Sequence, residues 1–189
     1  MLFRSGWTSE QQTVVPRAGL VVQWPVAEPI VAPWMDKPVD AQKADAARQL
    51  KEIERFFDRA KAWADAFEAD PKGTPGDLRF QNMVDVVRGR EPVILTANSP
   101  GSIESAVLWA TRRGLKPVIW GGLGADQCVP LLKKHDVPVI VSGTHRLPRR
   151  GGSAVDETYA LPAKLHAAGV RFAVATGSDP SNEIGRAHV

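Results

Sequence analysis

Apolar and polar positions follow two different rhythms along the 189-residue chain. Between residues 40 and 88, apolar side chains recur every three or four positions, which is typical of helices with one buried face. From residue 92 onward, short runs that are apolar throughout alternate with helical patterns. This second rhythm is typical of a parallel sheet covered by helices on both faces, so it predicts an α/β fold.

The clearest predicted helix covers Asp40–Ala69. Asp40 is a suitable N-cap, and the Pro- and Gly-containing stretch Asp70–Gly76 ends the helix. A second helix is predicted over Asp77–Arg88, with Gly89 at its end. The apolar stripe of the first helix consists of Leu50, Ile53, Phe57, Ala60, Ala64 and Phe67.

The segment before this helix, residues 6–39, contains five prolines and one apolar burst, Leu20–Val22. Proline fixes φ and removes a backbone donor, so we expect neither a long helix nor a central strand there. We therefore interpret residues 6–39 as an irregular Pro-rich segment.

Four short strands are predicted in the second part of the chain. They are Pro92–Ala97, Pro117–Trp120, Val137–Val141 and Val170–Ala175. The predicted helices between them are Ser102–Arg113, Asp126–His135 and Thr158–Ala168. In a barrel and in an open doubly wound sheet alike, functional residues follow the carboxyl ends of the strands.

Composition excludes several classes of partner. Basic residues exceed acidic ones by only 24 to 21, and the one cluster, Arg146, Arg149 and Arg150, is too small for a nucleic-acid surface. No apolar stretch approaches the roughly 20 residues of a membrane span. The single cysteine, Cys128, lies in an apolar run and is interpreted as a buried thiol. We expect neither nucleic acid nor membrane as a partner.

Both ends of the chain back-translate to DNA strings that resemble sequencing adapters. Residues 1–5 match the end of one common adapter, and residues 183–189 match the start of its partner. We therefore expect these two segments to be scars of an untrimmed environmental read. On this interpretation the natural sequence is a fragment, open at both ends.

Small and polar residues follow each predicted strand. The groups are Thr96–Ser99, Gly121–Asp126, Ser142–His145 and Thr176–Asp179. Thr96, Asn98, Gly121 and His145 are candidates for binding a small-molecule substrate. Capping of the next helix by Asn98 or Ser102 is an equally good interpretation of those two residues.

Two runs of sequence resemble the imidazolonepropionase-like branch of the amidohydrolase superfamily. They are VVRGREPVILTANSPGSIESAVLWATRRGLKPVIWGGLGAD (residues 86–126) and LPAKLHAAGVRFAVATGSD (residues 161–179). The resemblance implies a partial (β/α)8 TIM barrel over residues 40–182. Its parallel strands 5 to 8 would be Pro92–Thr96, Pro117–Gly121, Val137–Val141 and Arg171–Thr176.

The resemblance also implies where a metal site would lie. Thr96 and Gly121 stand where the family has histidine ligands on its fifth and sixth strands, and neither residue replaces an imidazole. Asp179 stands where the family has the Asp that binds metal and moves the proton, so it is the one candidate catalytic residue. The family typically binds zinc or another divalent metal. We expect this fragment to hold no metal or other cofactor and to be inactive alone.

The resemblance thus predicts a parent protein that hydrolyses a carbon–nitrogen bond in a cyclic amide or peptide-like substrate, with a degenerate metal site here. It leaves open whether the full-length parent is a homo-oligomer. One alternative is a non-catalytic barrel that serves as a binding or scaffold domain. The other is a nucleotide-binding open α/β domain, suggested by the Gly121–Gly124 loop alone.

A part of a barrel also implies exposed sheet edges. We expect the strands at Pro92 and Arg171 to present unpaired backbone groups and apolar faces. Residues 1–189 should therefore aggregate or bind hydrophobic dyes.

Overall fold

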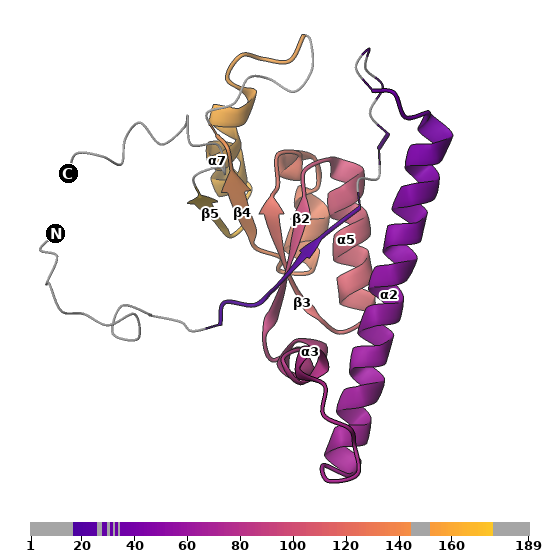
Figure 1. Cartoon of the computed structure of the whole chain (residues 1–189). Helices are drawn as coiled ribbons and strands as arrows, with labels where there is room; N and C mark the ends of the chain where they lie inside the picture. Colours follow the sequence, from indigo (N-terminus) through magenta and orange to yellow (C-terminus); the bar gives the residue numbers. More distant parts are fainter. Residues whose placement is uncertain are drawn as a thin grey trace, which may run out of the picture.

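The computed structural model describes residues 17–25, 28, 29, 31, 33, 35–144 and 152–175. Within these residues one sheet is formed, and every neighbouring pair of its strands is parallel (Figure 1). Its strands follow one another in chain order: β1 (Leu20–Gln23), β2 (Pro92–Ala97), β3 (Lys116–Gly121), β4 (Val139–Ser142) and β5 (Phe172–Ala175). The α/β class is confirmed, and this order is compatible with part of a barrel.

Helices connect the successive strands. The connection from β1 to β2 contains α2 (Val39–Ala69), α3 (Leu78–Gln81) and α4 (Val84–Val87). The later connections contain α5 (Pro100–Arg112), then a 3-10 turn (Ala125–Gln127) with α6 (Val129–Lys134), and finally α7 (Glu157–Ala167). Within the described residues, no helix combines the length and apolarity that spanning a bilayer requires.

The interpretation of residues 6–39 as irregular is wrong at Leu20–Gln23, which forms β1. This strand pairs in parallel with β2, and Leu20 lies opposite Val93. The prolines nearest to it, Pro16 and Pro25, flank the strand, so its ladder hydrogen bonds are kept. The expectation that the Pro92 strand is an unpaired edge is therefore also wrong, because β1 covers it.

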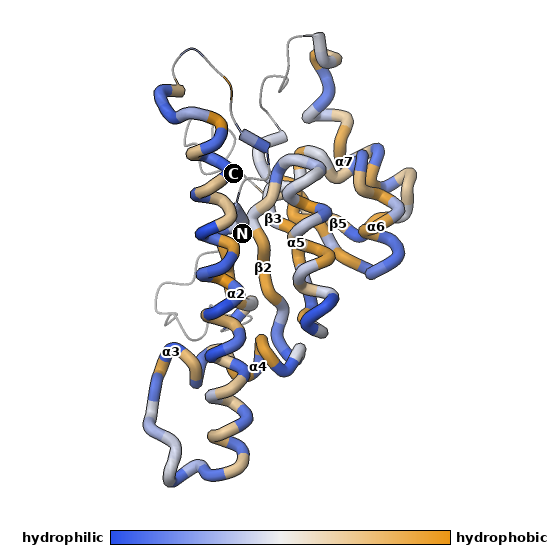
Figure 2. Tube along the Cα trace, turned by 90° about the vertical axis from the view of Figure 1, so that its right-hand side faces the viewer, coloured by the Kyte–Doolittle hydropathy of each residue, from blue (hydrophilic) through white to orange (hydrophobic). Residues whose placement is uncertain are grey.

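One face of the sheet packs against helices. On β2 the alternate residues Val93, Leu95 and Ala97 are buried and belong to the main apolar core. The helices contribute Phe57 and Ala60 from α2 and Ile103, Ala106 and Val107 from α5. Figure 2 shows β2 as an apolar stretch, whereas α2 alternates between apolar and polar residues along its length.

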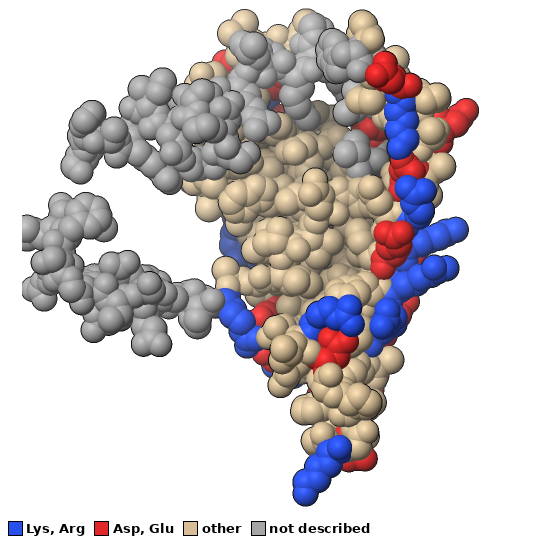
Figure 3. Space-filling model, viewed as in Figure 1, with Lys and Arg blue, Asp and Glu red and all other residues tan. Residues whose placement is uncertain are grey.

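The opposite face of the sheet is apolar but more exposed. Ile94 on β2 lies opposite Val21 on β1 and Val118 on β3. Val21 is 63% exposed. Trp120, two residues after Val118 on the same face of β3, is 37% exposed. Figure 3 shows an area over the strands that has no charged side chains. Parallel sheets in globular proteins are usually covered on both sides, so an exposed apolar face is unusual.

Two predicted helices are each interrupted. The predicted helix Asp77–Arg88 is two short helices, because the Met83 N–H donates to Phe80 O and tightens the chain at the junction. The predicted helix Asp126–His135 begins instead with a 3-10 turn. Pro130 has no N–H to donate to the carbonyl of Asp126, so α6 starts anew at Val129, with the proline in its first turn.

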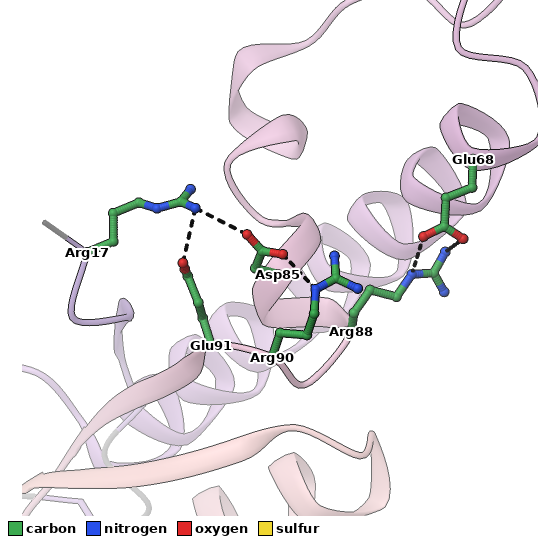
Figure 4. A network of polar contacts seen from close by, with 6 residues as sticks. All are labelled: Arg17, Glu68, Asp85, Arg88, Arg90 and Glu91. Carbon is green, nitrogen blue, oxygen red and sulfur yellow. Dashed lines mark hydrogen bonds and ion pairs between the residues drawn. The ribbon is translucent and has the colours of Figure 1, made fainter. Parts of the chain in front are cut away.

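An ion-pair network ties the amino ends of β1 and β2 together (Figure 4). Arg17, just before β1, lies 3.1 Å from both Asp85 and Glu91, and Arg90 Nε donates to Asp85 at 2.7 Å. Arg88 forms a neighbouring pair with Glu68 at the end of α2. Arg17 and Glu91 both precede their strands, so this network lies at the end of the sheet opposite to the candidate site.

Candidate functional site

The candidate site is the edge of the sheet where the parallel strands end. Residues that close the strands there include Gln23 on β1, Ala97 on β2, Gly121 on β3 and Ser142 on β4. In α/β proteins with parallel strands, ligands bind outside this carboxyl edge because the connecting loops converge there. Thr96, Asn98 and Gly121 all lie at this edge, as the sequence predicts.

Thr96 connects β2 to β1 through its side chain. Its Oγ1 accepts a hydrogen bond from the backbone N–H of Trp24 at 3.3 Å and donates to the carbonyl of Val22 at 3.4 Å. Both contacts are long for hydrogen bonds of this kind. The Thr96 hydroxyl therefore links the end of β2 to the backbone at the end of β1.

Thr96 and Gly121 lie on opposite faces of the sheet. In register, Thr96 lies opposite Trp120, and Gly121 lies opposite Ala97. Neighbouring residues of a strand point to opposite faces. Trp120, rather than Gly121, is therefore the β3 residue that shares the exposed sheet face with Thr96. Sequence reasoning missed Trp120 because an apolar strand gives no sign of which of its faces is covered.

Asn98 lies against Gly121 at the ends of β2 and β3. A Cβ atom placed on Gly121 would fall 3.0 Å from Asn98 Cγ and closer still to Oδ1. The helix that follows is capped by Ser99, whose Oγ accepts from the N–H of Ser102 at 3.3 Å. The N-cap of this helix is therefore Ser99, and not Asn98 or Ser102 as the sequence suggested.

The glycine loop after β3 is tied to the end of β2. The Gly122 N–H donates to Ala97 O, and the Gly124 N–H donates to Asn98 O, both at 2.8 Å. The Ala125 N–H donates to Gly122 O at 2.9 Å. A phosphate cradle requires such amides to point at the ligand. In this loop they are already paired with backbone carbonyls.

Thr96 and Gly121, which stand at the metal-ligand positions implied by the resemblance, do not supply the imidazole donors that those positions would need. Thr96 hydrogen-bonds to the backbone of β1, and Gly121 has no side chain. Across the described ranges, no three His, Cys, Asp or Glu side chains come together in a way that could hold a metal ion. A catalytic zinc site requires three protein donors with one open position. Both the residue types and their surroundings at positions 96 and 121 therefore disagree with a zinc site.

Two predicted site residues, Asp179 and His145, lie outside the described residues. Of the other histidines, His135 directly follows α6 and His166 lies in the last turn of α7. Both positions precede a strand, so they are at the opposite end of the sheet from the candidate site.

Two hollows that share lining residues from β1 and α2 lie beside β1. One, of about 530 Å³, is lined by Gln23, Trp24, Pro25, Gln49, Glu52 and Ile53. The other, of about 460 Å³, extends along β1 and adds Phe56 and Phe57. Together they follow the outer edge of β1, the first strand of the described sheet.

Comparison with known proteins gives a match in structure. No family model matches the sequence, and no curated protein matches it. The crystal structure of an amidohydrolase from Thermotoga maritima MSB8 superposes with a TM-score of 0.66 and 21% sequence identity. The match covers 87% of this chain and 43% of the Thermotoga chain, so this chain spans less than half of that protein. The protein therefore has an amidohydrolase-like fold.

Proposed function

We propose that this chain is part of a protein of the imidazolonepropionase-like branch, whose parent hydrolyses a carbon–nitrogen bond in a cyclic amide or peptide-like small molecule. The observation that supports this most is the likeness of its fold to the Thermotoga amidohydrolase. A fold hosts many chemistries, so the reaction itself is proposed from the residues at the strand ends.

The metal site is proposed to be degenerate within this segment. Two residues support this. The Thr96 hydroxyl hydrogen-bonds to the backbone of Val22 and Trp24, and Gly121 has no side chain. Asp179 is proposed as the remaining proton-transfer residue, and His145 as a residue that lines the substrate pocket. Zinc or another divalent metal would then need further donors from the rest of the parent.

A second candidate function is a non-catalytic barrel that binds ligands or acts as a scaffold. The specific support is that the Thr96 hydroxyl lies between the backbone groups of Val22 and Trp24, where it stabilises the β1–β2 pairing. A nucleotide-binding open sheet has less support. Its strand order would reverse at a switch point, whereas the described strands follow chain order.

The complete open reading frame separates these functions. The full-length protein should be purified after growth with zinc, and its bound metal should be measured by plasma mass spectrometry. Hydrolysis should then be assayed on cyclic amides and N-acyl amino acids, with and without a chelator. Turnover that is lost on chelation supports a hydrolase that takes its metal donors mainly from outside this segment. Absence of both turnover and metal would refute the hydrolase and favour the scaffold.

A further inference from the structure

Trp120 is exposed although it lies on the middle strand of the described sheet. β3 has β2 on one side and β4 on the other, so a sheet edge does not account for this exposure. Trp120 is 37% exposed, whereas Ile119, the residue before it, is fully buried in the core that the helices cover. Neighbouring residues of a strand point to opposite faces. Trp120 therefore lies on the sheet face that the described helices leave open.

The row of residues that crosses the sheet at Trp120 is uncharged. Trp120 lies opposite Thr96 on β2 and Ile140 on β4. The row continues to Gln23 on β1 and to Ala173 on β5, and adjacent strands are about 4.8 Å apart. The hydroxyl of Thr96 is already hydrogen-bonded to the backbone at the end of β1. The indole is thus flanked by neutral side chains, within the uncharged area of Figure 3.

The topology would place this row at the mouth of a barrel. In a (β/α)8 barrel the helices form the outer ring, so the sheet face without helices is the interior. Thr96 and Trp120 each lie one residue before the end of their strands, and Gln23 ends β1. Active sites of such barrels lie at the carboxyl ends of the strands. In the parent protein, Trp120 would therefore face the substrate.

An indole gives this place a chemistry different from metal binding. Its nitrogen is a hydrogen-bond donor only, so it supplies no lone pair to a metal ion. Its flat face instead favours offset stacking against another flat ring, beyond the gain from apolar burial alone. A charged ligand would lose hydration here without gaining an ion pair, because the row at Trp120 has no charge to offer. A neutral, planar ring is the ligand that this surface suits best.

We propose that Trp120 is a specificity-determining residue that stacks against a flat, uncharged ring of the substrate. The proposal rests on the proposed function and narrows its substrate class, from cyclic amides in general to cyclic amides with a planar ring. Recognition of the ring would then come from the β3 side chain that shares a face with Thr96.

Two lactams that differ in the shape of their rings test this on the 189-residue chain. 2-Quinolone is planar, and its octahydro derivative has the same bicyclic skeleton and the same amide but puckered rings. Saturation-transfer NMR titrations give the two dissociation constants. Stacking predicts that the chain binds the planar lactam about threefold to tenfold more tightly. Apolar burial alone predicts no such preference, because the puckered lactam has at least as much apolar surface.

Three variants identify the residue responsible. Trp120→Leu keeps an apolar side chain but removes the flat ring, so the preference for the planar lactam should disappear. Trp120→Phe keeps a smaller ring and should retain part of the preference. Val21→Ala is the matched control, because Val21 is an exposed apolar residue on the same face, and it should leave the preference unchanged. Circular dichroism verifies that each variant is folded.

A preference in Trp120→Leu as large as in the parent chain overturns the proposal, and so does a parent chain that binds neither lactam or both equally. If Trp120→Leu does not fold, an undiminished preference in Trp120→Phe has the same consequence. The proposed function fails on a different observation, namely no turnover and no metal in the full-length protein. Turnover without a planar-ring preference overturns the inference alone, whereas Trp120-dependent binding without turnover overturns the hydrolase alone.

Discussion

The ring of Trp24, the residue directly after β1, lies 5.1 Å from the ring of Trp109 on α5. Trp24 Nε1 donates a hydrogen bond of 2.8 Å to Ser105 Oγ, and the Trp24 side chain is buried. Phe57 of α2 meets the same Trp109 ring edge-on at 4.9 Å. Three aromatic residues thus join β1, α2 and α5.

Trp24→Ala should be among the most destabilising substitutions in this chain. It removes a buried ring from this cluster, so we expect a loss of about 3–5 kcal/mol in the free energy of unfolding. Ser105→Ala leaves the ring in place but removes the hydroxyl that accepts from Trp24 Nε1 and donates to Ser102 O, and it should cost about 1 kcal/mol. Urea denaturation followed by circular dichroism measures both. Similar costs for the two variants would mean that the ring contributes little.

Thr96→Val should reveal how much the side-chain link between β1 and β2 contributes. Valine keeps the shape and the β-propensity but loses both hydrogen bonds, so we expect a loss of about 0.5–1.5 kcal/mol. Thr96→Ser retains the hydroxyl and should lose less than Thr96→Val. The urea midpoint ranks the two, and the reverse ranking would show that packing of the methyl group matters more than the hydroxyl.

The stability of the chain should depend on pH through Asp85. The hydrogen bond from Arg90 mainly, and then the charges of Arg90 and Arg17, hold the pKa of this carboxyl below its usual value of 3.8. A carboxyl whose pKa is lowered on folding stabilises the fold above the unfolded value, and this contribution is lost as the pH falls through the folded pKa.

Asp85→Asn should therefore lower the melting temperature at pH 6 and have less effect at pH 3. High salt should reduce the difference, because the network is largely exposed. An equal effect at both pH values would show that the Asp85 charge does not stabilise the fold.

Cys128 should react slowly with alkylating reagents in the folded protein. Burial first, and then the charges of Glu104 and Asp126, raise the pKa of its thiol from 9.0 to about 11. The thiolate is the reactive form, so little of it is present at neutral pH. Iodoacetamide labelling, followed by mass spectrometry, should be complete in urea and slow without it. Rapid labelling of the folded chain would contradict the burial of this thiol.

The same shift predicts alkaline destabilisation. A thiol whose pKa is raised on folding stabilises the fold fully below the unfolded value, and this contribution is lost as the pH rises from 9.0 towards about 11. The melting temperature of Cys128→Ala should therefore fall less over this range than that of the parent chain.

Much of the fold could be predicted from local patterns. β2 has the predicted bounds, Pro92–Ala97, because every residue in it is apolar or β-prone and a charged residue precedes it. The predicted strand at Val170 is two residues too long at its start. The Val170 N–H donates to Leu165 O, so this residue closes the end of α7. β1 was missed because a four-residue strand among prolines is defined by its long-range pairing rather than by its own pattern.

The candidate site was less predictable. Thr96, Asn98 and Gly121 were placed correctly at the strand ends, because the alternation of strands and helices defines that edge. Their roles depend on register and on side-chain contacts between segments. The contact of Asn98 with Gly121 has no sequence signature, and neither does the sharing of one face by Thr96 and Trp120.

The distant pairing of β1 has a kinetic consequence. Trp24 and Thr96, which meet at the end of the β1–β2 ladder, are 72 positions apart, whereas the later strands are each joined by a single helical connection. Closing so large a loop has an entropic cost that must be met before its contacts form. The strands from β2 to β5 should therefore assemble first and β1 should dock last. In the native state, its amides should exchange with solvent earlier than those of β3.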